Sequence, residues 1–504
     1  MRHKIGLFLG PLLFILMVAI RPFPGLSTQA TSAAGIALLM ATWWITEAIP
    51  IPVTALVPLI LFPIFQIMSA RDVAMRYGDQ NIFLFMGGFF IAMAMQRWAL
   101  HKRIALYIVR LLGTSPRRIV LGFMCATAFL SMWISNTATA MMMFPIGLAV
   151  ILHVVKVIEK DNKGLDTTPG NFKFGLSLML GIAYSASIGG IATLVGTPPN
   201  IVFAGVVKSM FPAAIEVGFL DWLKIGLPLV VVMLPVTWVY LTYIAAPPEI
   251  ARIPGGKELI KADLAALGKM NRGEKLTLVV FLLVALAWIF RRDIDIGFFT
   301  IPGWSDLAGI SQHIHDSTVA IFGAVLLFLL PVDFKKHVFV LDWQWALRIP
   351  WGIILLFGGG FALAAGFQMS GLAQWIGERL SFLCGMPTII MILCICLLLT
   401  FLTEVTSNTA TTTMMMPVLG ALAAAACIHP FMLMIPAAMS ASCAFMLPVA
   451  TPPNAIVFGS GYLRIPDMAR VGFFLNIIGA IIITLLVYFL VIPVFKINTL
   501  PLPF

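Results

Sequence analysis

Charge is scarce in this sequence. Only 11% of its 504 residues are Asp, Glu, Lys or Arg, and 61% are hydrophobic, whereas soluble proteins carry about 25% charged residues. A chain with so few charges lacks the side chains that would cover a folded domain with a hydrated surface, so the composition excludes a soluble globular protein. It predicts an all-α polytopic membrane protein.

Cysteine is scarce as well. The six cysteines are scattered in or beside apolar segments, and only Cys394 and Cys396 have a spacing seen in metal sites. We interpret them as small buried hydrophobic residues. The sequence also has no His-Glu-x-x-His, no Gly-x-Gly-Asp and no phosphate-binding Gly-x-x-x-x-Gly-Lys-Ser/Thr. We therefore predict that the chain is neither an enzyme nor an ATP-driven pump.

Acidic residues are fewer than basic ones. The chain has 21 Asp and Glu against 32 Lys and Arg, which gives a formal net charge of +11. In a membrane protein such an excess reports basic cytoplasmic loops. We expect the lipid bilayer as a partner and no nucleic acid.

What the sequence does contain is a long internal repeat. Ser135-Asn136-Thr137-Ala138-Thr139 recurs 272 residues later, starting at Ser407, and the segments that start at Leu84 and Leu356 align at the same offset. A second pair of motifs follows, Gly196-Thr197-Pro198-Pro199-Asn200 in the first half and Ala450-Thr451-Pro452-Pro453-Asn454 in the second. The chain therefore consists of two related halves, each with a polar, helix-breaking spot inside apolar sequence.

Each Ser-Asn-Thr triplet lies in the middle of an apolar run, 119–152 in the first half and 387–427 in the second. Two arms of roughly 15 residues are each shorter than the ~20 residues of a full crossing, so we expect two re-entrant helical hairpins with the triplets at their tips. The Pro-Pro motifs should break the spans that contain them. We expect eleven transmembrane helices, at 5–20, 33–49, 50–67, 83–96, 174–208, 222–245, 276–290, 318–332, 350–368, 430–460 and 471–494.

The basic residues predict the orientation. With the N-terminus in the cytoplasm and the C-terminus outside, 23 of the 32 Lys and Arg residues fall on the cytoplasmic side, as the positive-inside rule requires. The two halves are then inverted repeats. Their hairpins open to opposite sides, and the tips must approach each other near the middle of the membrane.

Helix ends at such tips can bind ions. Free N–H groups at helix N-termini attract anions, and free carbonyls at C-termini attract cations. Ser, Asn and Thr add neutral donors and acceptors, and neither tip contains Lys or Arg. We predict an anion held by neutral groups, with Na⁺ ions as compensating charge, and at least two similar cation sites because the motif is doubled.

These motifs, together with Thr46-Glu47-Ala48-Ile49-Pro50, resemble the divalent anion/sodium symporter (DASS) family over essentially the whole chain. The resemblance implies a bacterial secondary active transporter of the inner (plasma) membrane. Such a protein carries C4-dicarboxylates such as succinate, malate or fumarate in symport with Na⁺. It implies a homodimer in which an elevator-type transport domain moves against a scaffold. The implied division is scaffold 1–118, transport half 119–245, cytoplasmic linker 246–275, scaffold 276–386 and transport half 387–504.

The resemblance also implies roles for individual residues. The implied substrate contacts are Ser135, Asn136, Thr137, Thr197, Ser407, Asn408, Thr409, Thr451 and Pro452. The implied first Na⁺ site consists of Ser131, Ser135, Asn136 and Gly196, and the second of Thr403, Thr406, Asn408 and the Ala450 carbonyl. Ser131 and Thr403 are themselves repeat mates, one helical turn before each tip.

Two acidic residues leave alternatives open. Glu404 lies three residues before the second tip, but its repeat mate is the uncharged Met132. It either binds a cation or proton or has a structural hydrogen-bonding role. Glu47 is expected to fix the junction between 33–49 and 50–67. The open functional alternatives are a Na⁺-independent exchanger, a proton-coupled symporter that uses Glu404, a citrate or sulfate transporter, and an anion channel.

Overall fold

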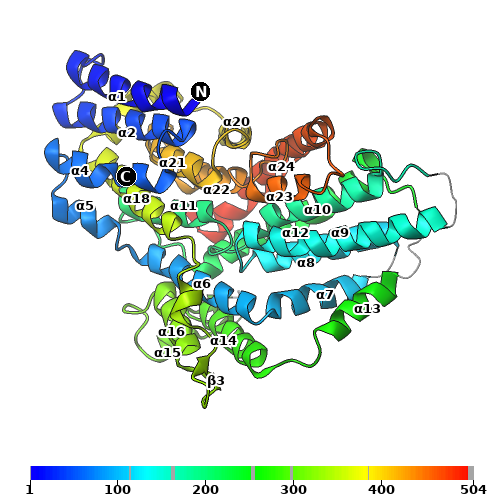
Figure 1. Ribbon diagram of the computed structural model, residues 1–504. Coiled ribbons are helices and arrows are strands. Elements are labelled where there is room, and N and C mark those ends of the chain that lie inside the picture. Colours follow the sequence, from blue (N-terminus) through cyan, green and yellow to red (C-terminus); the bar gives the residue numbers. More distant parts are fainter. Residues whose placement is uncertain are drawn as a thin grey trace.

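The computed structural model describes residues 2–112, 115–160, 165–250, 256–295, 299–383 and 385–497. Helices dominate these residues (Figure 1). The strands form two short antiparallel ribbons, β1 (Ile294–Asp295) with β2 (Thr300–Ile301) and β3 (Pro331–Asp333) with β4 (Val338–Phe339). Residues 251–255 of the expected linker and the C-terminal residues 498–504 lie outside the described ranges.

The N-terminal helices lie on the left of Figure 1, with α1 and α2 above α4 and α5. They are α1 (Arg2–Ile20), α2 (Thr28–Thr46), α3 (Ile51–Thr54), α4 (Val57–Ile64) and α5 (Ala70–Arg76). Helix α1 packs so closely against α2 that a side chain at Gly6 would overlap Thr46 and one at Gly10 would overlap Trp43. The opposite face of α1 exposes large apolar side chains such as Phe8, Leu12 and Ile15, which suits contact with lipid.

The sequence repeat is a repeat of helices. The paired elements are α6 (Gln80–Arg97) with α18 (Trp351–Met369), α7 (Leu100–Leu112) with α19 (Leu372–Arg379), α8 (Pro116–Ser131) with α20 (Thr388–Thr403), α9 (Asn136–Lys160) with α21 (Asn408–Ala425), α10 (Lys173–Gly190) with α22 (Phe431–Ser440), and α11 (Pro198–Met210) with α23 (Pro452–Phe458). The helices break at both Ser-Asn-Thr triplets and before both Pro-Pro pairs, as the sequence predicted.

The two halves interlock reciprocally. Helix α11 of the first half packs against α21 of the second, and α23 packs against α9 in the equivalent contact. The contacts of α10 with α23 and of α11 with α22 form a second such pair. The helices that follow the breaks, α12 (Phe219–Val239) and α24 (Ile465–Val494), also pack against each other. A site built at the breaks is therefore shared between the halves.

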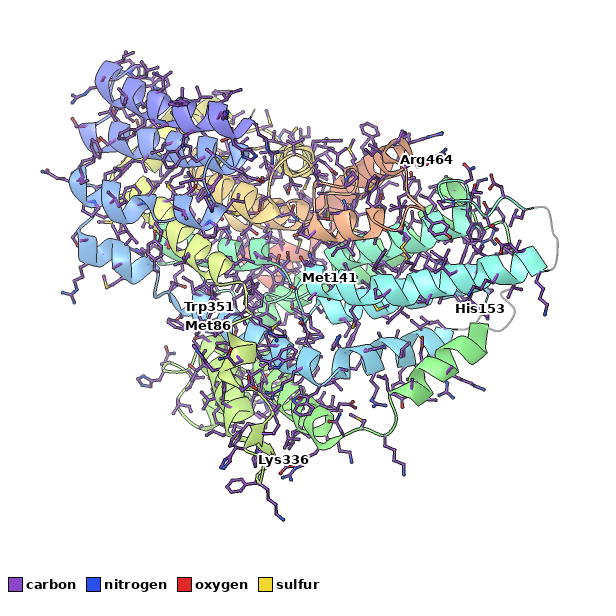
Figure 2. The ribbon with its side chains drawn as sticks, in the orientation of Figure 1. Met86, Met141, His153, Lys336, Trp351 and Arg464 are labelled. Atoms are coloured by element: carbon purple, nitrogen blue, oxygen red, sulfur yellow. The ribbon has the colours of Figure 1, made fainter. Side chains whose placement is uncertain are left out.

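The remaining elements surround this centre. They are the π-helix η1 (Tyr240–Ala245), α13 (Gly256–Ala266), α14 (Arg272–Ile289), α15 (Trp304–Leu307), α16 (Asp316–Leu329), α17 (Trp343–Ala346) and the 3₁₀-helix η2 (Ser381–Leu383). Helix α13 lies within the expected linker and packs against α7. Arg103 of α7 is buried in an ion pair of 2.8 Å with Glu274 of α14. Charged side chains such as Lys336 at the β3–β4 turn extend from the periphery (Figure 2).

The helix lengths agree only in part with the eleven transmembrane helices that the sequence predicted. Among the described residues, six helical stretches are long and apolar enough to cross a bilayer, namely Arg2–Ile20, Ala70–Arg97, Asn136–Lys160, Phe219–Ala245, Trp351–Met369 and Ile465–Val494. Several other expected spans consist of shorter or broken helices. The expected arm of roughly 15 residues was wrong for α9, which continues to Lys160 because Val154 and Ile158 still find buried positions.

Candidate functional site

The breaks at the two Ser-Asn-Thr triplets and before the two Pro-Pro pairs open into one cavity of about 670 Å³. Its wall contains the predicted tip residues Ser135, Asn136, Thr137, Gly196, Thr197, Thr406, Ser407, Asn408, Thr409, Ala450, Thr451 and Pro452. Apolar side chains, among them Phe85, Phe89 and Leu356, form other parts of the wall. The structure therefore brings together residues that are up to 317 positions apart in the sequence, from Ser135 to Pro452.

Four helices begin at this cavity. Helix α9 starts at Asn136, α21 is N-capped by Ser407, α11 by Thr197 and α23 by Thr451. Helices α9 and α21 begin with backbone N–H groups that have no intrahelical partner, whereas the Pro-Pro pairs leave the first turns of α11 and α23 without such donors. All four N-termini carry a partial positive charge. The tips supply no ionised side chain to this end of the cavity. The arrangement suits an anion bound by neutral donors.

Ser131 and Thr403 lie behind the cavity wall, each fully buried. Ser131 Oγ lies 2.7 Å from Asn136 Oδ1 and 2.6 Å from the Ala186 carbonyl oxygen. Thr403 Oγ1 repeats this arrangement, 2.7 Å from Asn408 Oδ1 and 3.1 Å from the Ala441 carbonyl oxygen. A hydroxyl has one proton, so each cluster of three oxygens has more acceptors than donors.

Further oxygens converge on the first of these clusters. A side chain added at Gly190 would lie 2.6 Å from Asn136 Oδ1 and 3.2 Å from the Gly196 carbonyl, and one at Gly196 would overlap the Gly190 carbonyl. Hydroxyl, amide and carbonyl oxygens are the ligands of hard cations such as Na⁺. The residues predicted for the first Na⁺ site therefore fit a cation chemically.

Sequence reasoning missed two residues of the site, Asn200 and Asn454, although it quoted both in their motifs. Asn200 Nδ2 donates to the carbonyls of Gly190 (3.2 Å) and Thr193 (2.7 Å). Asn454 Nδ2 donates to the carbonyls of Ala444 and Leu447, both at 3.0 Å. Both side chains are fully buried. Each Asn closes the irregular backbone of its own break, and the doubling of the final Asn in the motif was the signal that pointed to them.

Glu404 has the structural hydrogen-bonding role that was one of its two predicted alternatives. It is 3% exposed, and its carboxylate accepts hydrogen bonds from the backbone N–H groups of Phe445, Met446 and Leu447 at 2.7–3.1 Å. These residues form the break between α22 and α23. Glu404 thus fastens the second hairpin to the second break, a connection without a carboxylate counterpart at Met132.

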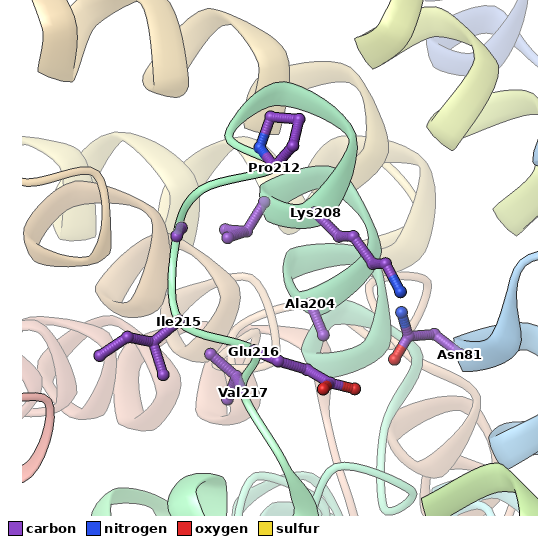
Figure 3. Close-up of a pocket in the computed structure, with 9 residues that line it drawn as sticks. Asn81, Ala204, Lys208, Pro212, Ile215, Glu216 and Val217 are labelled. Atoms are coloured by element: carbon purple, nitrogen blue, oxygen red, sulfur yellow. The ribbon is translucent and has the colours of Figure 1, made fainter. Parts of the chain in front are cut away.

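A smaller cavity of about 210 Å³ lies at the opposite end of α11, roughly 18 Å from Thr197 at 1.5 Å per residue. Lys208 of α11, Asn81 of α6 and Glu216 of the following loop point toward one another there (Figure 3). Glu216 also accepts a hydrogen bond from Gln80 and pairs with Arg292 and His315, each within 3.0 Å. These contacts hold the loop after α11 against the ends of α6, α14 and α16.

Repeated broken helices whose ends meet in one cavity between two halves define the class of this protein, a membrane-embedded secondary transporter. The chain belongs to the family described as the sodium:sulfate symporter transmembrane region, whose model matches residues 3–496. The resemblance to the divalent anion/sodium symporters is thereby confirmed.

Similar proteins are known from several bacteria. The chain is 48% identical over 501 residues to the sodium-dependent dicarboxylate transporter SdcS of Staphylococcus saprophyticus, covering 99% of this chain and 93% of the relative. It is 46% identical over 486 residues to SdcS of Staphylococcus aureus USA300, covering 96% and 90%. The crystal structure of the Alcanivorax borkumensis YdaH transporter shares the fold alone, with a TM-score of 0.51 at 12% identity over 81% of this chain and 84% of that one.

Proposed function

We propose that this protein carries C4-dicarboxylates such as succinate, malate or fumarate across a bacterial plasma membrane in symport with Na⁺. Two relatives that are 46–48% identical over at least 90% of their own length bear the name sodium-dependent dicarboxylate transporter. The observation that carries the proposal is the cavity in which four helix N-termini meet beside two oxygen-rich clusters.

The dicarboxylate binds between the two tips. One carboxylate faces Ser135, Asn136 and Thr137 with the start of α11 at Thr197. The other faces Ser407, Asn408 and Thr409 with Thr451 and Pro452 at the start of α23. Neutral donors at helix ends stabilise each carboxylate without forming a full ion pair, so release does not require separating buried opposite charges.

Co-transported Na⁺ occupies the two oxygen clusters. The first site consists of Ser131, Ser135, Asn136 and Gly196, and the second of Thr403, Thr406, Asn408 and the Ala450 carbonyl. Asn136 and Asn408 each contact both the Na⁺ ion and the dicarboxylate at their tip. Cation binding at Oδ1 leaves the amide N–H groups for the substrate, which couples the two ligands at the level of single side chains.

Transport follows an elevator mechanism in which 119–245 and 387–504 supply the moving domain, and 1–118 and 276–386 the scaffold. The exposed side chains of Arg2 and Glu47 line the cavity, and we take their side as its mouth. With a cytoplasmic N-terminus this is an inward-facing arrangement. Helix α11 meets α18 where a side chain at Gly205 would overlap the ring of Phe361. We infer that this close contact belongs to the sliding surface, and that the protein works as a homodimer with its C-terminus outside.

Radiolabelled succinate uptake into proteoliposomes, with and without an inward Na⁺ gradient, tests the proposal. We expect uptake that requires Na⁺ and is lost in Asn136→Ala, with Thr127→Val as the control. Thr127 lies one turn before Ser131 on α8 and its hydroxyl is bonded only within its own helix, to the Phe123 carbonyl. Uptake that is independent of Na⁺ but stimulated by internal succinate would instead identify an exchanger. Flux that does not saturate would identify a channel.

A further inference from the structure

The cavity has few ionisable side chains. Among the described residues in its wall, Arg2 and Glu47 alone are ionisable, and both side chains are exposed. Arg2 Nη2 lies 3.1 Å from Glu47 Oε2. An anion that enters or leaves on this side therefore passes one guanidinium and one carboxylate before or after it reaches a site made of neutral groups.

The fold fixes the place of Arg2. Gly6, one turn further along α1, brings this helix into direct contact with Thr46, the residue before Glu47. The imidazole Nδ1 of His3 lies 2.9 Å from the Glu47 carbonyl oxygen. The first turn of α1 is thus held against the end of α2, so that the Arg2 side chain reaches the cavity mouth rather than open lipid.

Glu47 occupies an unfavourable backbone conformation. It ends α2 with φ 51° and ψ 39°, in the left-handed region, where non-glycine residues are uncommon and Gly is the usual choice. This conformation turns the chain sharply at the end of α2, next to the first turn of α1. The Glu47 carboxylate is the group that pairs with Arg2.

The ion pair between Arg2 and Glu47 can form and break readily. The side chains of Arg2 and Glu47 are 57% and 44% exposed, and solvent screens such an ion pair strongly. The guanidinium contacts Glu47 through one nitrogen only, and a dicarboxylate at the mouth offers it a second carboxylate, which can bind it in a bidentate manner. Exchange between the two partners leaves Arg2 paired at every step.

We propose that Arg2 attracts dicarboxylates to the mouth of the cavity on the N-terminal side, and that Glu47 positions Arg2 and competes with the substrate for it. The inference rests on the proposed function in one respect, because it takes the cavity as the place where the dicarboxylate binds. It assigns a specificity role to Arg2 on one face of the membrane, since only substrate approaching from that face passes the pair.

The local potential is tested first, without any substrate. Ile353 lies in the wall of the cavity, and an Ile353→Cys protein is labelled in parallel with a sulfonate-bearing and a trimethylammonium-bearing methanethiosulfonate. Protein without the new cysteine corrects for native thiols. We expect Arg2→Gln to lower the ratio of anionic to cationic labelling about threefold and Glu47→Gln to raise it about threefold, both effects shrinking at high salt.

Lys4 provides the matched control. It lies two residues along the same helix, is exposed, and is not part of the cavity wall. Lys4→Gln removes the same charge and should leave the labelling ratio at the wild-type value. An unchanged ratio in Arg2→Gln, or an equal change in Lys4→Gln, overturns the inference whatever the protein transports.

Sided succinate uptake then tests the consequence. In inside-out membrane vesicles Arg2→Gln should raise KM about three- to tenfold, whereas in intact cells, where substrate meets the other face, KM should equal that of wild type. Equal KM changes on both faces contradict the inference. Wild-type protein without Na⁺-dependent uptake contradicts the proposed function instead, and the labelling ratio still decides the role of Arg2.

Discussion

Asn476, in the middle of α24, donates a hydrogen bond of 2.7 Å to Oε1 of Glu404 at the end of α20. The same oxygen accepts the backbone N–H groups of Phe445 and Met446. One buried carboxylate therefore joins the second hairpin, the second helix break and the last long helix. In the first half, the repeat mate Met132 has no carboxylate, and its backbone carbonyl accepts a hydrogen bond from Thr193 Oγ1 of the first break. The surroundings of the two cation sites are therefore held by different contacts.

Replacing Glu404 should destabilise the whole protein. Glu404→Ala leaves the N–H groups of Met446 and Leu447 without an acceptor, while the Phe445 N–H keeps only its longer bond to Asn476 Oδ1. Each unsatisfied buried group costs about 1–3 kcal/mol. We expect a large fall in Tm, with Asn476→Ala causing a smaller one because the backbone bonds remain. Thermal unfolding in detergent measures both. Glu378→Gln, an exposed glutamate, is the control. A Glu404→Ala protein with wild-type Tm would show that the carboxylate does not hold the break.

Na⁺ binding should weaken separately at the two clusters. Ser131→Ala and Thr403→Val each remove a hydroxyl that lies within 2.7 Å of a tip Asn oxygen. We expect the Na⁺ concentration for half-maximal thermal stabilisation to rise about tenfold, a loss of about 1.4 kcal/mol of binding free energy. Thr127→Val should retain the wild-type value. If neither substitution changes the Na⁺ dependence, the cation assignment is wrong.

Asn200→Ala and Asn454→Ala test whether the breaks are held by their own motifs. The Asn200 amide donates to three backbone carbonyls and the Asn454 amide to two, and each substitution removes these bonds. We expect the free energy of unfolding to fall by about 2 kcal/mol for each substitution because buried hydrogen bonds are lost. This lowers Tm, and we also expect weaker Na⁺ stabilisation. Asn→Asp should not rescue, since a carboxylate cannot donate to a carbonyl. Full rescue by Asp would mean that the Asn oxygens, rather than the amide protons, are the important groups.

The loop after α11 should respond to pH. Glu216 lies in this loop. Its hydrogen bond from His315, together with the nearby charges of Arg292 and Arg291, lowers the pKa of the Glu216 carboxyl from 4.5 to about 2. The ionised form is thus favoured in the folded protein, and the stability it contributes is present above about pH 4.5 and lost as the pH falls through about 2. We expect Glu216→Gln to lower Tm at neutral pH and the difference from wild type to shrink in this acidic range. A constant difference would exclude the carboxylate charge as its origin.

The helix breaks and the membership of the site could be predicted from sequence because both are encoded locally and twice. A triplet such as Ser135-Asn136-Thr137 is unusual in apolar sequence, and its second copy excludes chance. Prolines such as Pro198 and Pro452 mark helix starts by the donors they lack. Periodicity and composition were sufficient for these features, and the family match agrees with the resulting interpretation.

Other features depended on contacts between distant residues. The bond from Glu404 to residues 445–447 spans about forty positions, and no local pattern distinguishes it from a cation ligand. The length of α9 was underestimated because burial of Val154 and Ile158 against neighbouring helices extends it past the apolar run. The place of Arg2 in the cavity wall could not be predicted from the sequence, since the contact of Gly6 with Thr46 that positions it joins two segments that no local pattern connects.

The interlocking of the halves has a consequence for biosynthesis. The first tip, at Asn136, leaves the ribosome 272 residues before its partner at Asn408, a delay of roughly 14–54 s at 5–20 residues per second. During that time α9 and α11 lack the helices that later cover them, α23 and α21. Until the second half is made, the polar groups of the first half lie in the membrane without the helices that later pack against them. Insertion factors or lipid headgroups that shelter this waiting state would then influence how much transporter a cell can make.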